Sequence, residues 1–200
     1  MNKKRREGFY VKCGDKIFAA VLKSASGSII LAILEKHYKY ISDTNSHIQL
    51  DMKRLHLEAP KLRKGQINGK NVILISRNPM ERFRSACVEA EKTPEEAINE
   101  FGSSKMNPHF IPTSHWLVDG CKLYKFEDHL EEAVKDLGLD WPMPIVKGKK
   151  IPKPILTPEQ VKSVELFYNE DIILHRSIKK AAQPWEALKK PSVEEVLKFK

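Results

Sequence analysis

The sequence has few cysteines and no long apolar run. Its three cysteines, Cys13, Cys87 and Cys121, are odd in number, far apart in the sequence and without a C-x-x-C pair. This pattern argues against a disulfide framework and against a zinc site. The basic start, MNKKRREGFY, is not followed by the apolar core of a signal peptide, and no apolar run approaches the length needed to cross a bilayer. We therefore expect no membrane span and a cytoplasmic location.

Internal repeats and low-complexity segments are also absent. The 200 residues, with 41% hydrophobic and 30% charged residues, suit one globular domain. We place its core at about residues 9–178 and expect a C-terminal helical extension over 179–200. The net charge of +9 and the pI of about 9.4 favour an acidic partner. Nucleic acid, a phosphorylated cofactor, an anionic sugar and an anionic membrane surface all fit this charge.

Strands and helices alternate along the chain, which predicts an α/β fold with a mainly parallel sheet. Residues 47–63 fit either a strand or a helix, and residues 102–120 form a long loop of the kind that is often functional. Short helices are expected around Trp185 and over 193–199. The predicted strands are 17–22, 71–76 and 121–126. The predicted helices run from the loop after the first strand to Ile41, and over 80–91, 93–101, 127–137 and 157–178.

A loop of small residues follows the first predicted strand. Lys23 precedes Ser24-Ala25-Ser26-Gly27-Ser28, and a helical pattern begins directly afterwards. A strand, a small-residue loop and a helix N-terminus together present backbone N–H groups and a helix dipole to an anion. Serine is also a common helix cap, so the composition alone would fit a turn without a ligand. The loop is not a Walker A sequence, because its lysine comes before the glycine and not after it.

A second polar stretch follows the strongest predicted strand. Arg77 lies at the carboxyl end of that strand, where open α/β sheets bind ligands, and Ser85 lies two helical turns further on. Both could bind one oxyanion, since arginine binds phosphate in a bidentate manner. The alternative is structural: Arg77 and Arg82 would pair with Glu81 or other nearby carboxylates.

The combination of LKSASGS with ISRNPMERFRSA resembles the sulfotransferases, in particular the carbohydrate sulfotransferase branch. Three further stretches are similar to segments of that family, so that the likeness runs from about residue 16 to residue 175. They are Asn107–Pro112, Leu123–Glu127 and Leu156–Asp171. The resemblance implies a P-loop-like three-layer fold, with a central mainly parallel sheet flanked by helices. It also suggests a compact soluble bacterial or viral form of the family.

The resemblance implies 3′-phosphoadenosine 5′-phosphosulfate (PAPS) as the sulfuryl donor and adenosine 3′,5′-bisphosphate (PAP) as the product, without a metal. The acceptor would be a hydroxyl group, with a carbohydrate as the expected class, and no nucleic-acid partner is expected. By position, Arg77 and Ser85 would hold the 3′-phosphate. The 5′ side would be held by Lys23, Ser24, Ala25, Ser26, Gly27 and Ser28. A late basic loop, containing Lys147, Gly148 and Lys149, would close over the donor.

Sulfuryl transfer requires charge stabilisation on the leaving phosphate and a base for the acceptor proton. Lys23 is the expected catalytic cation. His109 is the first candidate for the base, His56 the second and Glu127 the third. The chain departs from the family pattern where Leu22 replaces a proline and serine and alanine replace a threonine in the loop.

Two other functions fit parts of the sequence. A P-loop-like nucleotide kinase would use the same strand, loop and helix, but the sequence lacks GK[ST] after the loop and an obvious Walker B carboxylate. A non-enzymatic basic module would bind nucleic acid or a sulfated glycan with strong salt dependence. Its aromatic residues are scattered and not interleaved with basic ones, which argues against a single-strand platform.

Overall fold

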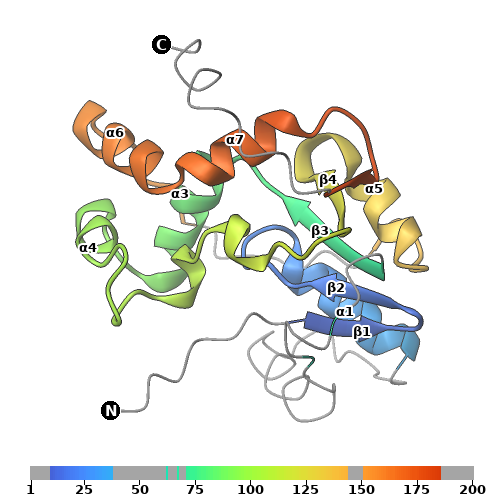
Figure 1. Cartoon of the computed structure of the whole chain (residues 1–200). Helices are drawn as coiled ribbons and strands as arrows, with labels where there is room; N and C mark the ends of the chain where they lie inside the picture. The colour runs from blue at the N-terminus through green and yellow to red at the C-terminus, as the bar shows by residue number, and fades with distance from the viewer. Residues whose placement is uncertain (1–9, 38–61, 63–66, 68–70, 144–150, 186–200) are drawn as a thin grey trace, which may run out of the picture.

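The structure is a computed structural model, and it describes residues 10–37, 62, 67, 71–143 and 151–185 (Figure 1). Its centre is a five-stranded sheet with the strand order β1-β2-β3-β4-β5. The strands are β1 (Tyr10–Cys13), β2 (Lys16–Ala19), β3 (Val72–Ser76), β4 (Lys122–Lys125) and β5 (Gln183–Pro184).

The sheet is mixed, with parallel pairing in its centre and antiparallel pairing at both edges. Strand β3 lies parallel to both β2 and β4. At one edge β1 and β2 form a hairpin whose turn contains Gly14 in the left-handed region, at φ 61°. At the other edge β5 pairs antiparallel with β4. The expected mainly parallel sheet therefore describes the three central strands, and the two edge strands were not predicted.

The helices begin where the sequence places capping residues. The Asn78 side chain accepts the N–H groups of Met80 and Glu81 at the start of α3, and Thr93 and Thr157 each form a capping box. Gly138, at φ 72°, follows the end of α5. In the described ranges the α-helices are α1 (Ser26–His37), α3 (Pro79–Ala90), α4 (Pro94–Asn99), α5 (Phe126–Asp136), α6 (Pro158–Phe167) and α7 (Asn169–Ser177).

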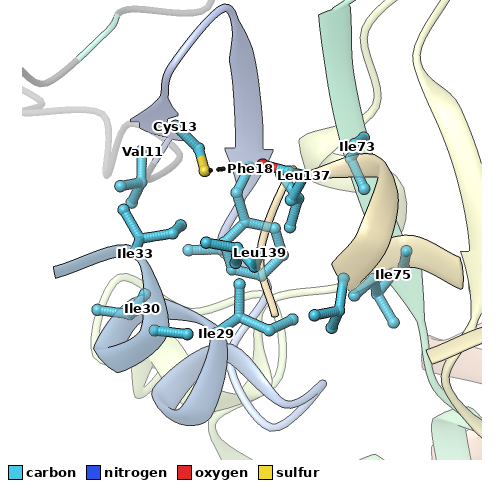
Figure 2. Packing of buried hydrophobic residues seen from close by; sticks show 14 of the residues in the cluster. Val11, Cys13, Phe18, Ile29, Ile30, Ile33, Ile73, Ile75, Leu137 and Leu139 are labelled. Atoms are coloured by element: carbon cyan, nitrogen blue, oxygen red, sulfur yellow. Dashed lines mark hydrogen bonds between the residues drawn. The ribbon is translucent and has the colours of Figure 1, made fainter. Parts of the chain in front are cut away.

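Helices cover both faces of the sheet. Neighbouring residues of a strand point to opposite faces, and all residues of β3 are buried, so both faces must be covered. Ile73 and Ile75 of β3 face α1 and the end of α5, and Figure 2 shows them with Phe18 and Ile29 in this cluster. On the opposite face Val72 and Leu74 pack with Leu174 of α7 and Trp116, which belongs to the 3-10 helix η4 (Thr113–Trp116). The fold is therefore α/β, with helices on both sides of a five-stranded mixed sheet.

A third cluster joins the helices that do not cover the sheet. Phe83 of α3 packs with Ala97 of α4, Val164 of α6, and Phe110 of the 3-10 helix η3 (Pro108–Phe110). The long loop predicted over 102–120 therefore contains two short 3-10 turns. In Figure 1, α3, α4 and α6 lie beside the sheet.

Two expectations for the C-terminal part are wrong. The helix predicted over 157–178 is two helices, which meet at Tyr168. The expected helix around Trp185 is replaced by β5, and the Trp185 N–H donates to the Cys121 carbonyl at 2.6 Å. The alternatives for 47–63, apart from Leu62, and the helix over 193–199 fall outside the described residues, as does the end of the first helix beyond His37. None of the helices in the described ranges is long and apolar enough to cross a membrane.

Candidate anion-binding site

The loop between β2 and α1 has a backbone that alternates in handedness. Lys23 and Ala25 lie in the left-handed region at φ 67° and 60°, whereas Ser24 between them does not. Ser26 then begins the 12-residue helix α1. Alternation of this kind turns successive N–H groups toward one point and forms an anion-binding concavity. The first N–H groups of α1, at Ser26 and Gly27, lie at its positive end.

Ser24 adds an unusual polar group to this loop. Its residue is 1% exposed, and its hydroxyl finds no hydrogen-bond partner among the described residues. Its backbone N–H donates to the Val21 carbonyl at 3.3 Å, which holds the loop in a tight turn. A buried hydroxyl without a partner is unfavourable by about 1–3 kcal/mol, so such a group needs an explanation.

Arg77 joins this loop to the end of β3. Its Nη1 donates to the Lys23 carbonyl at 2.9 Å, and its guanidinium lies 4.9 Å from the centre of the Phe126 ring. Burial lowers the pKa of Arg77 from its usual value, while the nearby Glu127 carboxylate acts in the opposite direction. Arg77 has five N–H donors, and the bond to Lys23 uses one of them. The two motifs that the sequence predicted to act together are therefore in direct contact.

The Lys23 side chain contacts the helix that follows Arg77. Its Nζ lies 3.3 Å from Oε2 of Glu89, in the last turn of α3. Ser85 precedes Glu89 by four residues, so both lie on the same face of α3. Ser85 is 9% exposed. The face that carries Ser85 is thus the face that meets Lys23.

His109 lies in the same neighbourhood. Burial lowers the pKa of His109, the positive charge of Lys23 lowers it further, and Glu89 acts in the opposite direction. The His109 Nδ1 atom is buried and finds no hydrogen-bond partner in the described part of the chain. Arg82 holds the backbone of the segment around His109, since its Nη1 donates to the Ile111 carbonyl at 3.0 Å and to the His109 carbonyl at 3.4 Å.

Arg82 and Asp171 form the polar centre that holds this segment. The Arg82 Nη2 atom lies 3.3 Å from Oδ2 of Asp171, and both side chains are 1% exposed. Asp171 also accepts the N–H groups of Thr113 at 2.6 Å and Ser114 at 2.8 Å. The Tyr168 hydroxyl donates to the Phe110 carbonyl at 2.7 Å. Arg82 therefore has the structural role of the alternative, in which it pairs with a carboxylate, but its partner is Asp171 and not Glu81.

Among the described residues, Arg77 does not form the ion pair with Glu81 that the structural alternative named. That carboxylate instead pairs with Arg84 and Lys153, each at 2.7 Å. The Arg84 Nε atom donates to the Pro154 carbonyl at 2.8 Å, so α3 also holds the extended segment after residue 150.

Glu127 belongs to a second polar cluster, which also contains His175 and Ser76. Its Oε1 accepts the Asn78 N–H at 2.9 Å, and its Oε2 lies 3.6 Å from Nε2 of His175. The His175 Nδ1 atom lies 3.2 Å from the Ser76 hydroxyl. Both carboxylate oxygens of Glu127 are therefore occupied, one by the N–H of Asn78 before α3 and the other by His175.

The structure brings together most of the predicted site residues that it describes, from Lys23 to Ser28 with Arg77, Ser85 and His109. His56, Lys147, Gly148 and Lys149 fall outside the described residues. Sequence reasoning missed Glu89 and His175 and gave Asp171 no role. Glu89 could have been found from its position one helical turn after Ser85. In the described ranges, no group of three or more histidine, cysteine or acidic residues could hold a metal ion.

Comparisons of the chain with models of protein families, with curated proteins and with solved structures each found no match. The arguments about function that follow therefore depend on the motifs and on the geometry described above.

Proposed function

We propose that this chain is a sulfotransferase, which moves a sulfuryl group from PAPS to a hydroxyl acceptor on a P-loop-like fold. The observation that carries the proposal is the 2.9 Å hydrogen bond from Arg77 Nη1 to the Lys23 carbonyl. It joins the loop that would hold the 5′-phosphosulfate to the segment that would hold the 3′-phosphate. A donor with phosphate groups at both ends requires two anion-binding elements at neighbouring places.

The residues present fit such a donor. The alternating backbone at Lys23 and Ala25 offers N–H groups to an anion, and the buried Ser24 hydroxyl lacks a partner that a phosphate or sulfate oxygen would supply. The free donors of Arg77 would bind the second phosphate, with Ser85 on the nearby face of α3. A carbohydrate acceptor follows from the family resemblance alone.

In the proposed reaction the acceptor oxygen forms a bond to sulfur while the bond between sulfur and the bridging oxygen of the donor breaks. The Lys23 ammonium would stabilise the negative charge that develops on that oxygen. His109 would take the acceptor proton, since burial and Lys23 both keep its imidazole neutral and able to accept one. PAP then leaves with both electrons of the broken bond.

Calorimetric titration of the full chain with PAP tests the donor site. We expect micromolar binding by the wild type and weakening of about 10- to 100-fold in Arg77→Ala, the usual loss for a hydrogen bond to a charged group. Arg77→Lys keeps the charge but not the planar fork, and should recover only part of the affinity. The matched control is Arg176→Ala, which removes an exposed arginine of α7 and should leave the affinity unchanged.

The same titration separates the other functions. Absence of PAP binding by the wild type would reject the sulfotransferase proposal. Binding of ATP with Mg²⁺ in preference to PAP would favour the nucleotide kinase. Binding of polyanions with steep salt dependence, and without a discrete PAP site, would favour the basic module.

A further inference from the structure

Glu89 occupies a position that an anion-binding site does not by itself require. Its carboxylate oxygen Oε2 lies 3.3 Å from Lys23 Nζ, and the two side chains are 29% and 23% exposed. Each therefore keeps some access to solvent, and among the residues that the structure describes this is the one ion pair that either group forms. A partly exposed pair of this kind contributes little to the stability of a fold.

A carboxylate beside this loop also opposes the binding of an anion. The surrounding groups favour negative charge: the Lys23 ammonium, the Arg77 guanidinium and the positive end of α1. Glu89 neutralises one of these and would repel a phosphate or sulfate that came close. Glu89 therefore does not increase the affinity for the donor. Its presence is better explained by a role in holding Lys23 before the donor binds, or by a role in a step after binding.

We propose that Glu89 is the exchangeable partner of Lys23: it holds the lysine at the loop while no anion is bound, and releases it to the 5′ anionic group of the donor. The inference rests on the proposed function and makes Glu89 a positioning residue that acts through Lys23. Exchange needs a partner that is weakly held, and the single 3.3 Å contact between half-buried groups fulfils this condition.

The exchange has a consequence for His109, because three charged groups act on its imidazole. Lys23 of the loop and Arg82 of α3 lower its pKa, while Glu89 of α3 raises it, and Asp171 of α7 pairs with Arg82 behind it. When Lys23 turns to the donor, its charge is compensated by the donor anion and the Glu89 carboxylate is left unpaired. His109 then becomes a stronger base only once the donor is in place.

Titration of the full chain with PAP compares the wild type, Glu89→Gln and the control Glu95→Gln. Glu95 is exposed on α4, so its substitution makes the same change in net charge away from the loop. We expect Glu89→Gln to bind PAP about three- to tenfold more tightly than the wild type, and Glu95→Gln to differ by less than about twofold. Equal affinities of the two variants would overturn the role of Glu89 while leaving the donor site intact. No binding by the wild type would overturn both proposals.

A second measurement begins with the wild type alone, so it still tests the proposal should Glu89→Gln fail to fold. The pKa of His109, followed by NMR in the wild type, should rise when PAP binds, and the rise should be smaller in Glu89→Gln. A His109 pKa that PAP leaves unchanged in the wild type would overturn the proposal. A rise of the same size in both proteins would overturn it as well.

Discussion

Among the described residues, helix α3 takes part in three ion pairs with distant segments, and two of them, at Arg82 and Glu89, lie two helical turns apart. Arg82 pairs with Asp171 with both side chains 1% exposed, and the pair also makes hydrogen bonds to four backbone groups. Lys23 pairs with Glu89 through one contact, with each side chain about a quarter exposed. One pair is enclosed and multiply bonded, and the other is open and singly bonded.

The difference between the two ion pairs distinguishes the residues that hold the candidate site in place from the residues that would bind a ligand. An enclosed ion pair cannot lose one member without leaving a buried charge, so Arg82 and Asp171 fix the segment that contains His109. An open pair exchanges partners at little cost, so Lys23 can turn to a ligand. Both kinds of pair are made by one helix, which therefore holds the rigid side and the exchangeable side at a fixed separation.

The largest expected effect comes from breaking the enclosed pair. Asp171→Ala leaves Arg82 as an uncompensated buried charge and removes the acceptor of two backbone N–H groups. We expect a loss of about 3–5 kcal/mol in the free energy of unfolding, measured by urea denaturation. Glu170→Ala, at the exposed neighbouring position, should change that free energy by less than about 0.5 kcal/mol. Equal losses in the two variants would show that the pair is not the support we describe.

Breaking the open pair of Lys23 and Glu89 should reduce the affinity for PAP more than it reduces the stability of the fold. Lys23→Met removes a partly exposed cation, so the free energy of unfolding should change by about 1 kcal/mol or less. The affinity for PAP, measured by calorimetry, should fall by about 1.5–3 kcal/mol, as for a lost hydrogen bond between charged groups. A variant that loses stability but keeps its affinity would contradict the assignment of Lys23 to the donor site.

The smallest effect concerns pH. Burial lowers the pKa values of His109 and His175 below their usual 6.5, so between pH 6.5 and these lower values the folded protein binds fewer protons than the unfolded chain. The contribution of these two histidines to the free energy of unfolding should therefore be complete above about pH 6.5. It should be lost as the pH falls through their folded-state pKa values. Urea denaturation at about pH 7.5 and 5.5 measures this decrease. His175→Gln should give a flatter pH dependence than the wild type, and identical dependences would contradict the prediction.

Much of the framework could be predicted from local sequence. The apolar run of β3, the caps Asn78 and Thr93 and the terminating Gly138 act within a few residues, so the strand and helix positions followed from them. Tyr168 shows what local sequence misses. It ends α6 because its ring packs against Phe83 and its hydroxyl reaches the Phe110 carbonyl, and these are contacts with distant parts of the chain.

The candidate site divides in the same way. Lys23 and Arg77 stand in motifs with a recognisable order, so their meeting could be predicted, although the bond between them could not. Glu89 lies one helical turn after Ser85, which makes it a candidate, but it is 66 residues from Lys23, so the contact between the two could not be predicted from local sequence. The edge strand β5 is only two residues long and depends on β4 to pair with, so its sequence alone favours no strand.

The long sequence separation between Asp171 and Arg82 affects the order in which the parts of the candidate site are completed during synthesis. It lies 89 residues after Arg82, whereas the loop and Arg77 both precede Arg82 in the chain. A ribosome therefore delivers both proposed anion-binding elements, and His109 as well, before it delivers the aspartate that supports the His109 segment. We expect the nascent chain to gather its proposed anion-binding groups first and to fix the proposed base only after α7 has docked.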